Sequence, residues 1–388
     1  MNWDERPFGE LAKIAEGQVD PQKKPYCDMF HIGPENVQSG TGLISNLSLA
    51  KDLGLISGKY LFDKESIVYS KIRPNLNKIC LPNFTGICSA DMYPIWPKKE
   101  LLDRNYLFYF MNSFLFLKPA IAASMRTGLP KINRSDLMRI KVCFPKSLMQ
   151  QKVIANILSS WDATTEKIEW LIAVKEKRFL WLTRSLIGSR CEKWPSLKAE
   201  KIFTDTSEKN RPEEELLSVT QDRGVIPRSM LEGRVMSPEG STASYKLIKK
   251  GDFVVSLRSF QGGIEYSAYQ GIISPAYTVL RSKIEIDRNY FRLFFKTHIF
   301  IKKYLRIAVI GIRDGKQISI PDLMTVKIPC PPLDEQKRIA TTLDTARREI
   351  DLHKNQLAAL QKQKRGLMQK LLTGKWRVKA SEAKEVSP

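Results

Sequence analysis

An internal repeat constrains the fold of this chain more than any other feature of its sequence. The residues Asp-Arg-Asn-Tyr at 103–106 recur at 287–290, and Asp-Leu-Met at 136–138 recurs at 322–324. The repeat distance of 184 to 186 residues indicates a duplicated domain rather than a solenoid, because solenoid units contain about 20 to 50 residues. A protein with two similar halves can present two similar surfaces to a target with two similar parts.

The composition indicates what kind of target this is. The 388 residues contain 63 Lys and Arg against 41 Asp and Glu, which gives a formal net charge of +22 and a pI near 9.7. A charge of this size favours a polyanionic partner, and nucleic acid is the usual one. The length allows two to four domains, and 43% hydrophobic residues are enough for ordinary cores.

The sequence does not indicate a signal peptide, a membrane span, a zinc site or a set of disulfides. Residues 1–6 include two acidic residues and a tryptophan, whereas a signal peptide needs a basic start and an apolar run. No stretch approaches the roughly 18 to 20 apolar residues that cross a bilayer. The six cysteines are scattered without a CxxC pair and only three histidines are present, so neither a zinc site nor a disulfide framework is expected. We therefore expect a cytoplasmic protein without membrane contact.

Each half of the repeat has the same internal plan, which predicts two similar α+β domains. A β-type run, an aromatic helical patch and a strand bounded by prolines follow one another in each half. These are Ser66–Ser70, Tyr106–Phe116 and Ile140–Phe144 in the first half, and Asp252–Ser256, Tyr290–Phe300 and Val326–Ile328 in the second.

A long helix is predicted after each domain. Apolar residues recur at alternating steps of three and four, which is the pattern of a helix-pairing seam. The seam comprises Leu158, Trp161, Thr165, Ile168, Ile172, Lys175, Phe179, Leu182 and Leu186, and Leu343, Ala346, Ile350, His353, Leu357, Leu360, Lys364, Leu367 and Leu371. The alternative is that each helix lies only on its own domain. The period near 3.5 favours pairing, and a pseudo-two-fold repeat makes the pair antiparallel.

Several segments resemble the specificity subunits of type I restriction-modification systems. Residues 331–340 (PPLDEQKRIA) and 366–375 (GLMQKLLTGK) are similar to the family's C-terminal conserved region, and residues 151–188 to its central one. Residues 70–74 (SKIRP) and 128–132 (GLPKI) are also similar to the segments that precede that central region. The resemblance covers nearly the whole chain.

The resemblance implies two target recognition domains that each read one half of a bipartite double-stranded DNA sequence. Two antiparallel helices would fix the unread spacer and dock two methyltransferase subunits, and translocase-nuclease subunits would complete the complex. S-adenosylmethionine, ATP and Mg²⁺ would belong to those partners, with no cofactor in this chain. The implied segments are recognition domain 1 (1–146), the central helix (147–190), recognition domain 2 (191–331), the C-terminal helix (332–376) and a tail (377–388).

Three other functions fit the sequence less well than DNA recognition does. Pro331-Pro332 lacks the preceding polar residue and following aromatic of an amino-methyltransferase motif. Asp322, Glu335 and Lys337 have the outline of a metal-dependent nuclease, although Glu335 also suits the first turn of a helix. A coiled-coil adaptor without a DNA role leaves the net charge of +22 unexplained. We therefore expect a non-catalytic DNA-binding subunit.

Candidate base-reading residues fall in two clusters in each half, chosen because Arg, Lys, Asn, Gln and short polar side chains read base edges from loops. One cluster follows the first β-type run, and the other is a glycine loop. For any single residue, contact with phosphate or solvent is the simpler explanation. The candidates are Lys71, Arg73, Asn75, Lys78, Arg126 and Lys131 in the first half, and Arg258, Ser259, Gln261, Arg313, Asp314, Lys316 and Gln317 in the second.

Overall fold

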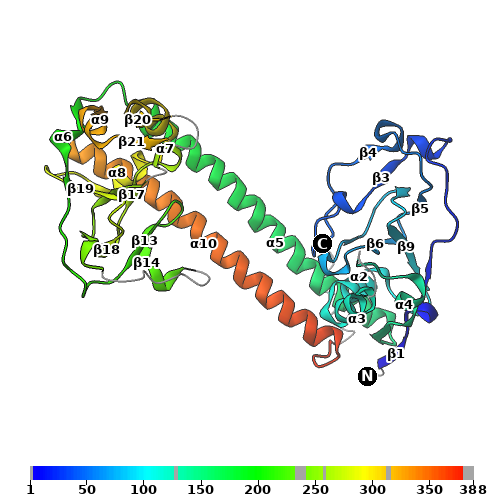
Figure 1. Ribbon diagram of the computed structural model, residues 1–388. Helices are drawn as coiled ribbons and strands as arrows, with labels where there is room; N and C mark the ends of the chain where they lie inside the picture. The colour runs from blue at the N-terminus through cyan, green and yellow to red at the C-terminus, as the bar shows by residue number, and fades with distance from the viewer. Residues whose placement is uncertain (1–2, 126–129, 232–241, 257–258, 312–315, 379–388) are drawn as a thin grey trace. The chain divides into compact units, whose positions relative to one another are not determined.

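The computed structural model describes residues 3–125, 130–231, 242–256, 259–311 and 316–378 (Figure 1). The chain forms two compact units. Unit 1 contains residues 1–170 and 355–388, and unit 2 contains residues 171–354. The two long helices, α5 (Leu148–Thr183) and α10 (Leu333–Leu372), each contribute to both units.

The globular part of unit 1 is built from short strands and a few helices. A four-stranded sheet has the order β2-β9-β6-β7, a second has the order β4-β3-β8-β5, and β1 pairs with β10. The elements are β1 (Trp3–Pro7), α1 (Phe8–Leu11), β2 (Ala12–Ile14), β3 (Phe30–Ile32), β4 (Ser48–Leu49), β5 (Tyr60–Phe62), β6 (Ile67–Ser70), β7 (Ile79–Cys80), β8 (Gly86–Cys88), β9 (Met92–Pro97), α2 (Arg104–Asn112), α3 (Phe114–Ser124), α4 (Arg134–Arg139) and β10 (Lys141–Pro145).

The globular part of unit 2 follows the same plan. Its main sheet has the order β12-β19-β16-β17, and β11 pairs with β22. The elements are β11 (Ser196–Lys198), α6 (Ala199–Ile202), β12 (Phe203–Thr206), β13 (Leu217–Thr220), β14 (Gly224–Pro227), β15 (Lys246–Ile248), β16 (Phe253–Val255), α7 (Ser259–Gly262), β17 (Glu265–Tyr266), β18 (Gly271–Ile273), β19 (Thr278–Ser282), α8 (Arg288–Phe294), β20 (Val309–Ile310), β21 (Gln317–Ile318), α9 (Ile320–Thr325) and β22 (Lys327–Pro329).

The strand pairing confirms the predicted duplication. The pair β1–β10 corresponds to β11–β22, and β2-β9-β6-β7 corresponds to β12-β19-β16-β17. Even the parallel contact recurs, because His31 pairs with Ile87 in unit 1 and Leu216 pairs with Ile272 in unit 2. The α+β fold with an internal repeat is therefore correct.

The repeated Asp-Arg-Asn-Tyr sequence begins the aromatic helix of each domain. A carboxylate oxygen of Asp103 accepts a hydrogen bond from the Tyr106 amide at 2.9 Å, and Asp287 accepts one from the Tyr290 amide at 2.7 Å. This is the usual capping of a helix N-terminus. The tyrosine that follows each cap is fully buried. The repeat therefore preserves a cap and a core residue rather than a surface.

Each aromatic patch is shorter as a single helix than the sequence pattern indicated. In unit 1 the chain bends by 61° between α2 and α3 at Ser113, whose hydroxyl donates to the Phe110 carbonyl at 2.6 Å. No single helix in the described ranges is long and apolar enough to cross a membrane. Within those ranges, only α2 and α3 taken together across the bend have the necessary length and apolar composition. Residues Tyr106 to Met111 of α2 lie in the core of unit 1.

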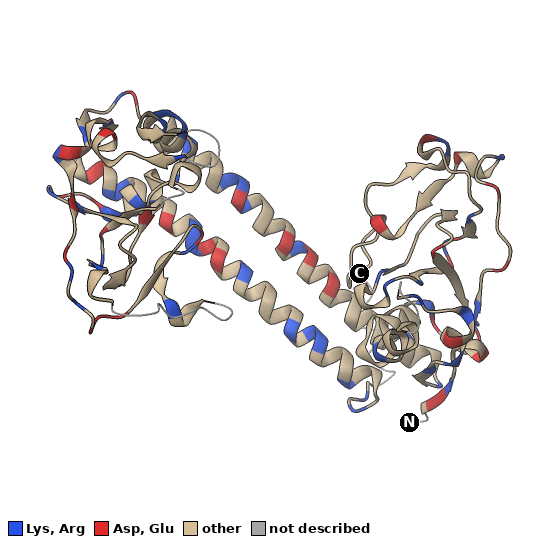
Figure 2. Cartoon of the chain, in the orientation of Figure 1, with Lys and Arg blue, Asp and Glu red and all other residues tan. Residues whose placement is uncertain are grey.

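The long helices pair in both units, as the heptad pattern predicted. None of the eighteen seam positions is exposed. In unit 1, Lys364 forms an ion pair with Asp162, and Gln361 donates to Glu169 at 3.4 Å. In unit 2, Lys354 lies 2.6 Å from Glu176, and the Arg347 guanidinium lies 4.2 Å from the centre of the Phe179 ring. Partner numbers run in opposite directions, so the helices are antiparallel. Figure 2 shows basic and acidic residues interspersed along both helices.

The core of unit 1 includes residues from the C-terminal part of α10. Met368, Leu371 and Leu372 are buried in one cluster with Phe144 and Leu158. Beyond the helix, Gly374 approaches Trp3 so closely that a Cβ atom there would lie 2.8 Å from the indole ring. Domain 1 is thus completed by residues that follow it by more than 200 positions.

Candidate DNA interface

The first predicted reading cluster of unit 1 lies in the loop that follows β6. Arg73 and Asn75 are exposed there. Arg73 and Asn77 have positive φ angles of 46° and 45°, a conformation that costs a non-glycine residue energy and is concentrated at functional sites. The amide of Arg73 is held by the Pro130 carbonyl at 2.7 Å, so the strained loop is fixed by the segment after the glycine loop.

The structure brings the two predicted clusters of unit 1 together. Ile72 pairs with Lys131 in an antiparallel bridge, and the Ile132 amide donates to the Lys71 carbonyl at 2.9 Å. The Lys71 ammonium lies 5.0 Å from the centre of the Tyr93 ring. Burial, and next the charge of Lys131, lower the pKa of Lys71. This concentration of positive charge beside an exposed loop suits a phosphate-rich partner.

Not every candidate in unit 1 is free to contact DNA. The Lys78 ammonium donates to the Pro34 carbonyl at 2.5 Å and is partly buried, which gives it a role in holding the loop. Arg126 lies outside the described residues.

The clusters of unit 2 also meet. Gln261 is exposed on α7, and Lys316 and Gln317 are exposed at the start of β21. Helix α7 packs beside β21, as Figure 1 shows. Ser259 is only 1% exposed, and its hydroxyl accepts a hydrogen bond from the Ser256 amide at 2.8 Å. This burial argues against base contact by Ser259. Arg258, Arg313 and Asp314 lie outside the described residues.

Comparison with known proteins assigns the chain to a family. The family described as "Type I restriction modification DNA specificity domain" matches residues 1–175 and 209–362. The chain belongs to the specificity subunits of type I restriction-modification systems. Such a subunit is the non-catalytic, DNA-recognising component of its system.

Relatives support this membership over different lengths. The MjaVIII specificity subunit of Methanocaldococcus jannaschii is 28% identical over 97% of this chain and 94% of its own. The EcoDI specificity subunit of Escherichia coli is 37% identical, but the match spans 43% of this chain and 37% of that one.

Solved structures share the fold. The HsdS subunit from Thermoanaerobacter tengcongensis has a TM-score of 0.54 at 18% identity, covering 96% of this chain and 97% of that one. A chain from a structure on type I complex assembly and conformational transition has a TM-score of 0.63 at 18% identity, covering 95% and 97%.

The alternative that Asp322, Glu335 and Lys337 form a nuclease site is wrong for this specificity subunit. One carboxylate oxygen of Glu335 accepts the indole N–H of Trp194 at 3.0 Å, and the other accepts a hydrogen bond from Arg190 at 3.3 Å. Asp322 lies in the first turn of α9, capped by Ser319. Within the described ranges, no group of three or more His, Cys, Asp or Glu residues could hold a metal ion. Glu335 therefore fixes the start of α10 rather than a metal.

Sequence reasoning missed the residues whose side chains fix the loops that are predicted to read bases. Asn112 ends α2, and its side-chain oxygen accepts a hydrogen bond from the Asn77 amide group at 3.1 Å. Lys296 follows α8 and donates to the Gly262 carbonyl at 3.0 Å. Asn112 and Lys296 are 184 residues apart. The repeat distance could have paired them, although their side chains are chemically different.

Proposed function

We propose that each globular domain of this specificity subunit reads one half of a bipartite double-stranded DNA target. The observation that carries the proposal is the equivalent meeting of two polar clusters in both domains, around Lys71 and Lys131 in one and around Gln261 and Gln317 in the other. Exposed Arg, Lys, Asn and Gln side chains on loops are the groups that read base edges and touch phosphates. A net charge of +22 suits the same partner.

The five segments delimited from the sequence are the proposed functional parts. Residues 1–146 and 191–331 are the recognition domains, residues 147–190 and 332–376 are the helices that set the unread spacer, and residues 377–388 are a tail. A paired stretch of about 25 residues spans roughly 37 Å, close to one turn of B-DNA at about 34 Å.

The proposed partners are two methyltransferase subunits docked on the helices and translocase-nuclease subunits that complete the restriction complex. S-adenosylmethionine, ATP and Mg²⁺ would bind to those subunits, and the complex would act in the cytoplasm. Exposed apolar residues on α5 support docking, since Val174, Leu180 and Trp181 are 40%, 58% and 64% exposed. Exposed large apolar groups at one place commonly mark protein interfaces.

The proposal is tested by mapping methylated positions in DNA from a host that expresses this chain with its methyltransferase partner. A motif with two specified halves and an unspecified spacer is expected. Replacing Lys316 and Gln317 by Ala is expected to relax one half only, with about 1 to 3 kcal/mol lost for each base contact. Equal relaxation of both halves, or a continuous motif, contradicts the proposal.

A further inference from the structure

A turn containing a left-handed glycine lies against the reading loop of each domain. In unit 1 the turn spans residues 38–42, and its Gly40 has a φ angle of 73°. The Gly40 amide donates to the Asn77 carbonyl at 3.2 Å, and the Ser39 hydroxyl donates to the Leu76 carbonyl. The turn and the reading loop are therefore joined directly.

The corresponding turn of unit 2 is residues 221–224, between β13 and β14, and its Gly224 has a φ angle of 72°. Here the link is a side chain. The Lys296 ammonium donates to the Gln221 carbonyl at 3.2 Å and to the Gly262 carbonyl at 3.0 Å. One cation thereby ties the turn to α7, which carries Gln261.

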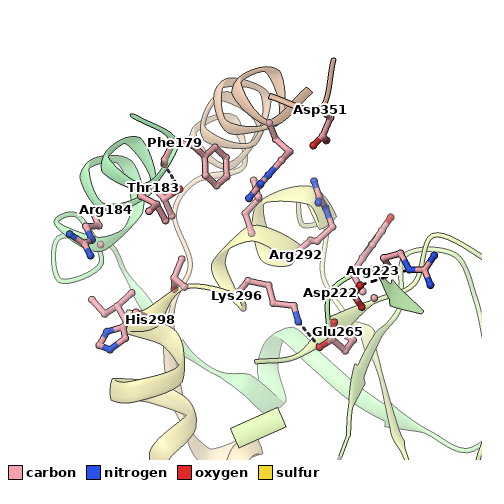
Figure 3. Close-up of a pocket in the computed structure, with 18 residues that line it drawn as sticks. Phe179, Thr183, Arg184, Asp222, Arg223, Glu265, Arg292, Lys296, His298 and Asp351 are labelled. Carbon is pink, nitrogen blue, oxygen red and sulfur yellow. Dashed lines mark hydrogen bonds and ion pairs between the residues drawn. The ribbon is translucent and has the colours of Figure 1, made fainter. Parts of the chain in front are cut away.

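Lys296 is itself fixed by a buried carboxylate. It forms an ion pair with Glu265, which is 1% exposed and lines a cavity of about 1020 Å³ (Figure 3). The carboxylate side of this ion pair is buried, whereas the Lys296 side chain is 33% exposed. The ammonium also donates to two carbonyls, and moving it away would leave the buried carboxylate without its partner. Lys296 thus fixes the turn at residues 221–224 relative to α7.

The side chains exposed at the two turns are of the types that can read base edges. Gln38, Ser39 and Thr41 are exposed in unit 1, and Gln221, Asp222 and Arg223 are exposed in unit 2. The links from the turns to the reading loops use the backbone carbonyl of Gln221, the amide of Gly40 and the hydroxyl of Ser39, so they do not occupy the side chains of Gln38 or Gln221. In Figure 3 the Arg223 guanidinium points away from the cavity.

We propose that these glycine turns, residues 38–42 and 221–224, form a second base-reading segment in each domain, and that Asn112 and Lys296 position them. The proposal rests on the proposed function, since it concerns how each half-site is read. Gln pairs with adenine and Arg with guanine in the major groove. Two segments fixed to each other cover more base pairs of a half-site than one loop does.

The test uses the full chain in complex with its methyltransferase partner and a DNA library with both half-sites randomised. Gln221→Ala with Arg223→Ala is expected to reduce base preference at one or two positions of one half-site by about 5- to 150-fold. Gln38→Ala with Thr41→Ala is expected to act only on the other half-site. Each variant is thus the matched control for the other.

The positioning role has its own readout. Lys296→Met is expected to weaken preference at positions assigned to both Gln221 and Gln261, whereas Lys296→Arg is expected to restore part of it, because a cation again bridges the two carbonyls. Thermal melting establishes that each variant is folded. If Lys296→Met does not fold, the base preference of Lys296→Arg is compared with that of Gln221→Ala instead.

The outcomes separate the inference from the proposed function. If the turn variants lose affinity uniformly or not at all, while replacing Lys316 and Gln317 still relaxes one half-site, the turns do not read bases and only this inference is overturned. If none of the variants changes any half-site preference, the proposed function itself is wrong.

Discussion

Gln151 and Gln336 occupy the same position in the first turn of the two long helices, and each amide is used inside the protein. The side-chain oxygen of Gln151 accepts a hydrogen bond from the Asp103 backbone amide at 2.7 Å. Its side-chain nitrogen donates hydrogen bonds to the Leu101 and Pro145 carbonyls at 2.9 and 2.8 Å. The side-chain oxygen of Gln336 accepts a hydrogen bond from the Asp287 backbone amide at 2.9 Å, and its nitrogen donates one to the Pro331 carbonyl at 2.8 Å. Each helix is thereby fixed to the cap of an aromatic helix.

Gln336→Ala is expected to lower the free energy of unfolding by about 2 to 3 kcal/mol, because it leaves buried backbone groups without partners. Lys337→Ala, at an exposed neighbour, is the control and is expected to stay within about 0.5 kcal/mol. Urea titration of both variants makes the comparison. Equal effects of the two substitutions contradict this role for Gln336.

Glu265 makes the second domain sensitive to pH. Burial raises the pKa of Glu265 to about 7, although the hydrogen bond and charge of Lys296 oppose the rise and nearby Asp222 adds to it. The ordinary value is 4.5. The folded state therefore holds this proton more tightly than the unfolded state. Its stabilising effect is complete below about pH 4.5 and is lost as the pH rises through about 7.

The melting temperature of the wild type is thus expected to fall between pH 5 and 8 relative to that of Glu265→Gln, which keeps the shape and carries no titratable proton. Differential scanning calorimetry at a series of pH values measures this. Parallel pH profiles for the two proteins would show that Glu265 does not titrate in this range.

Residue roles were the part of the site least predictable from sequence. The duplicated Asp103 and Asp287 were visible as a repeat, but only the hydrogen bonds identify them as helix caps. Ser259 was a reasonable base reader by residue type and is buried instead. Side-chain chemistry indicates what a residue can bind, whereas burial depends on packing that distant segments supply.

At the scale of elements, the heptad pattern predicted the helix pair, because a seam of period near 3.5 is a strong local signal, and the pseudo-two-fold repeat predicted its antiparallel direction. The aromatic patch was less predictable. Residues 106–116 are apolar except for Asn112 and Ser113. Two polar residues inside an apolar patch are also compatible with one exposed turn of a continuous helix, so the pattern alone does not predict the 61° bend at Ser113.

The ion pair between Asp162 and Lys364 provides a test of the helix pair in unit 1. Asp162 also accepts the Tyr109 hydroxyl at 2.8 Å, so the pair joins both helices to domain 1. Lys364→Glu is expected to lower the free energy of unfolding by about 1 to 2 kcal/mol through like-charge repulsion. Adding Asp162→Lys is expected to recover part of that loss.

A double-mutant cycle in urea measures the coupling. Additive effects of the two substitutions show that the residues do not interact in solution. Glu166→Lys, on the same helix and exposed, is the control for a general change of charge.

At the scale of the whole molecule, the proposed spacer function predicts the effect of lengthening both helices. One heptad inserted after Ile172 and one after Leu357 preserve the seam and lengthen each helix by about 10.5 Å. At about 3.4 Å per base pair this corresponds to roughly three base pairs, with a rotation of close to a third of a turn. We expect the selected spacer to shift by about one to three base pairs while both half-sites stay the same.

The measurement is binding to a library that contains every spacer from about four to twelve base pairs. An insertion variant that folds, binds its methyltransferase partner and still selects the wild-type spacer contradicts the spacer function of the helices.

The burial of Met368, Leu371 and Leu372 in the core of unit 1 also sets an order of events during synthesis. Domain 1 leaves the ribosome first, yet its core lacks these side chains until the end of α10 has been translated. At about 5 to 20 residues per second, the newly made domain waits for roughly 10 to 45 seconds with apolar surface uncovered. Unit 2 waits for less of the chain, because Ile187, which is buried there, precedes domain 2, and Leu343 and Ile350, which are also buried there, follow it within 20 positions. The half that is made first is therefore finished last.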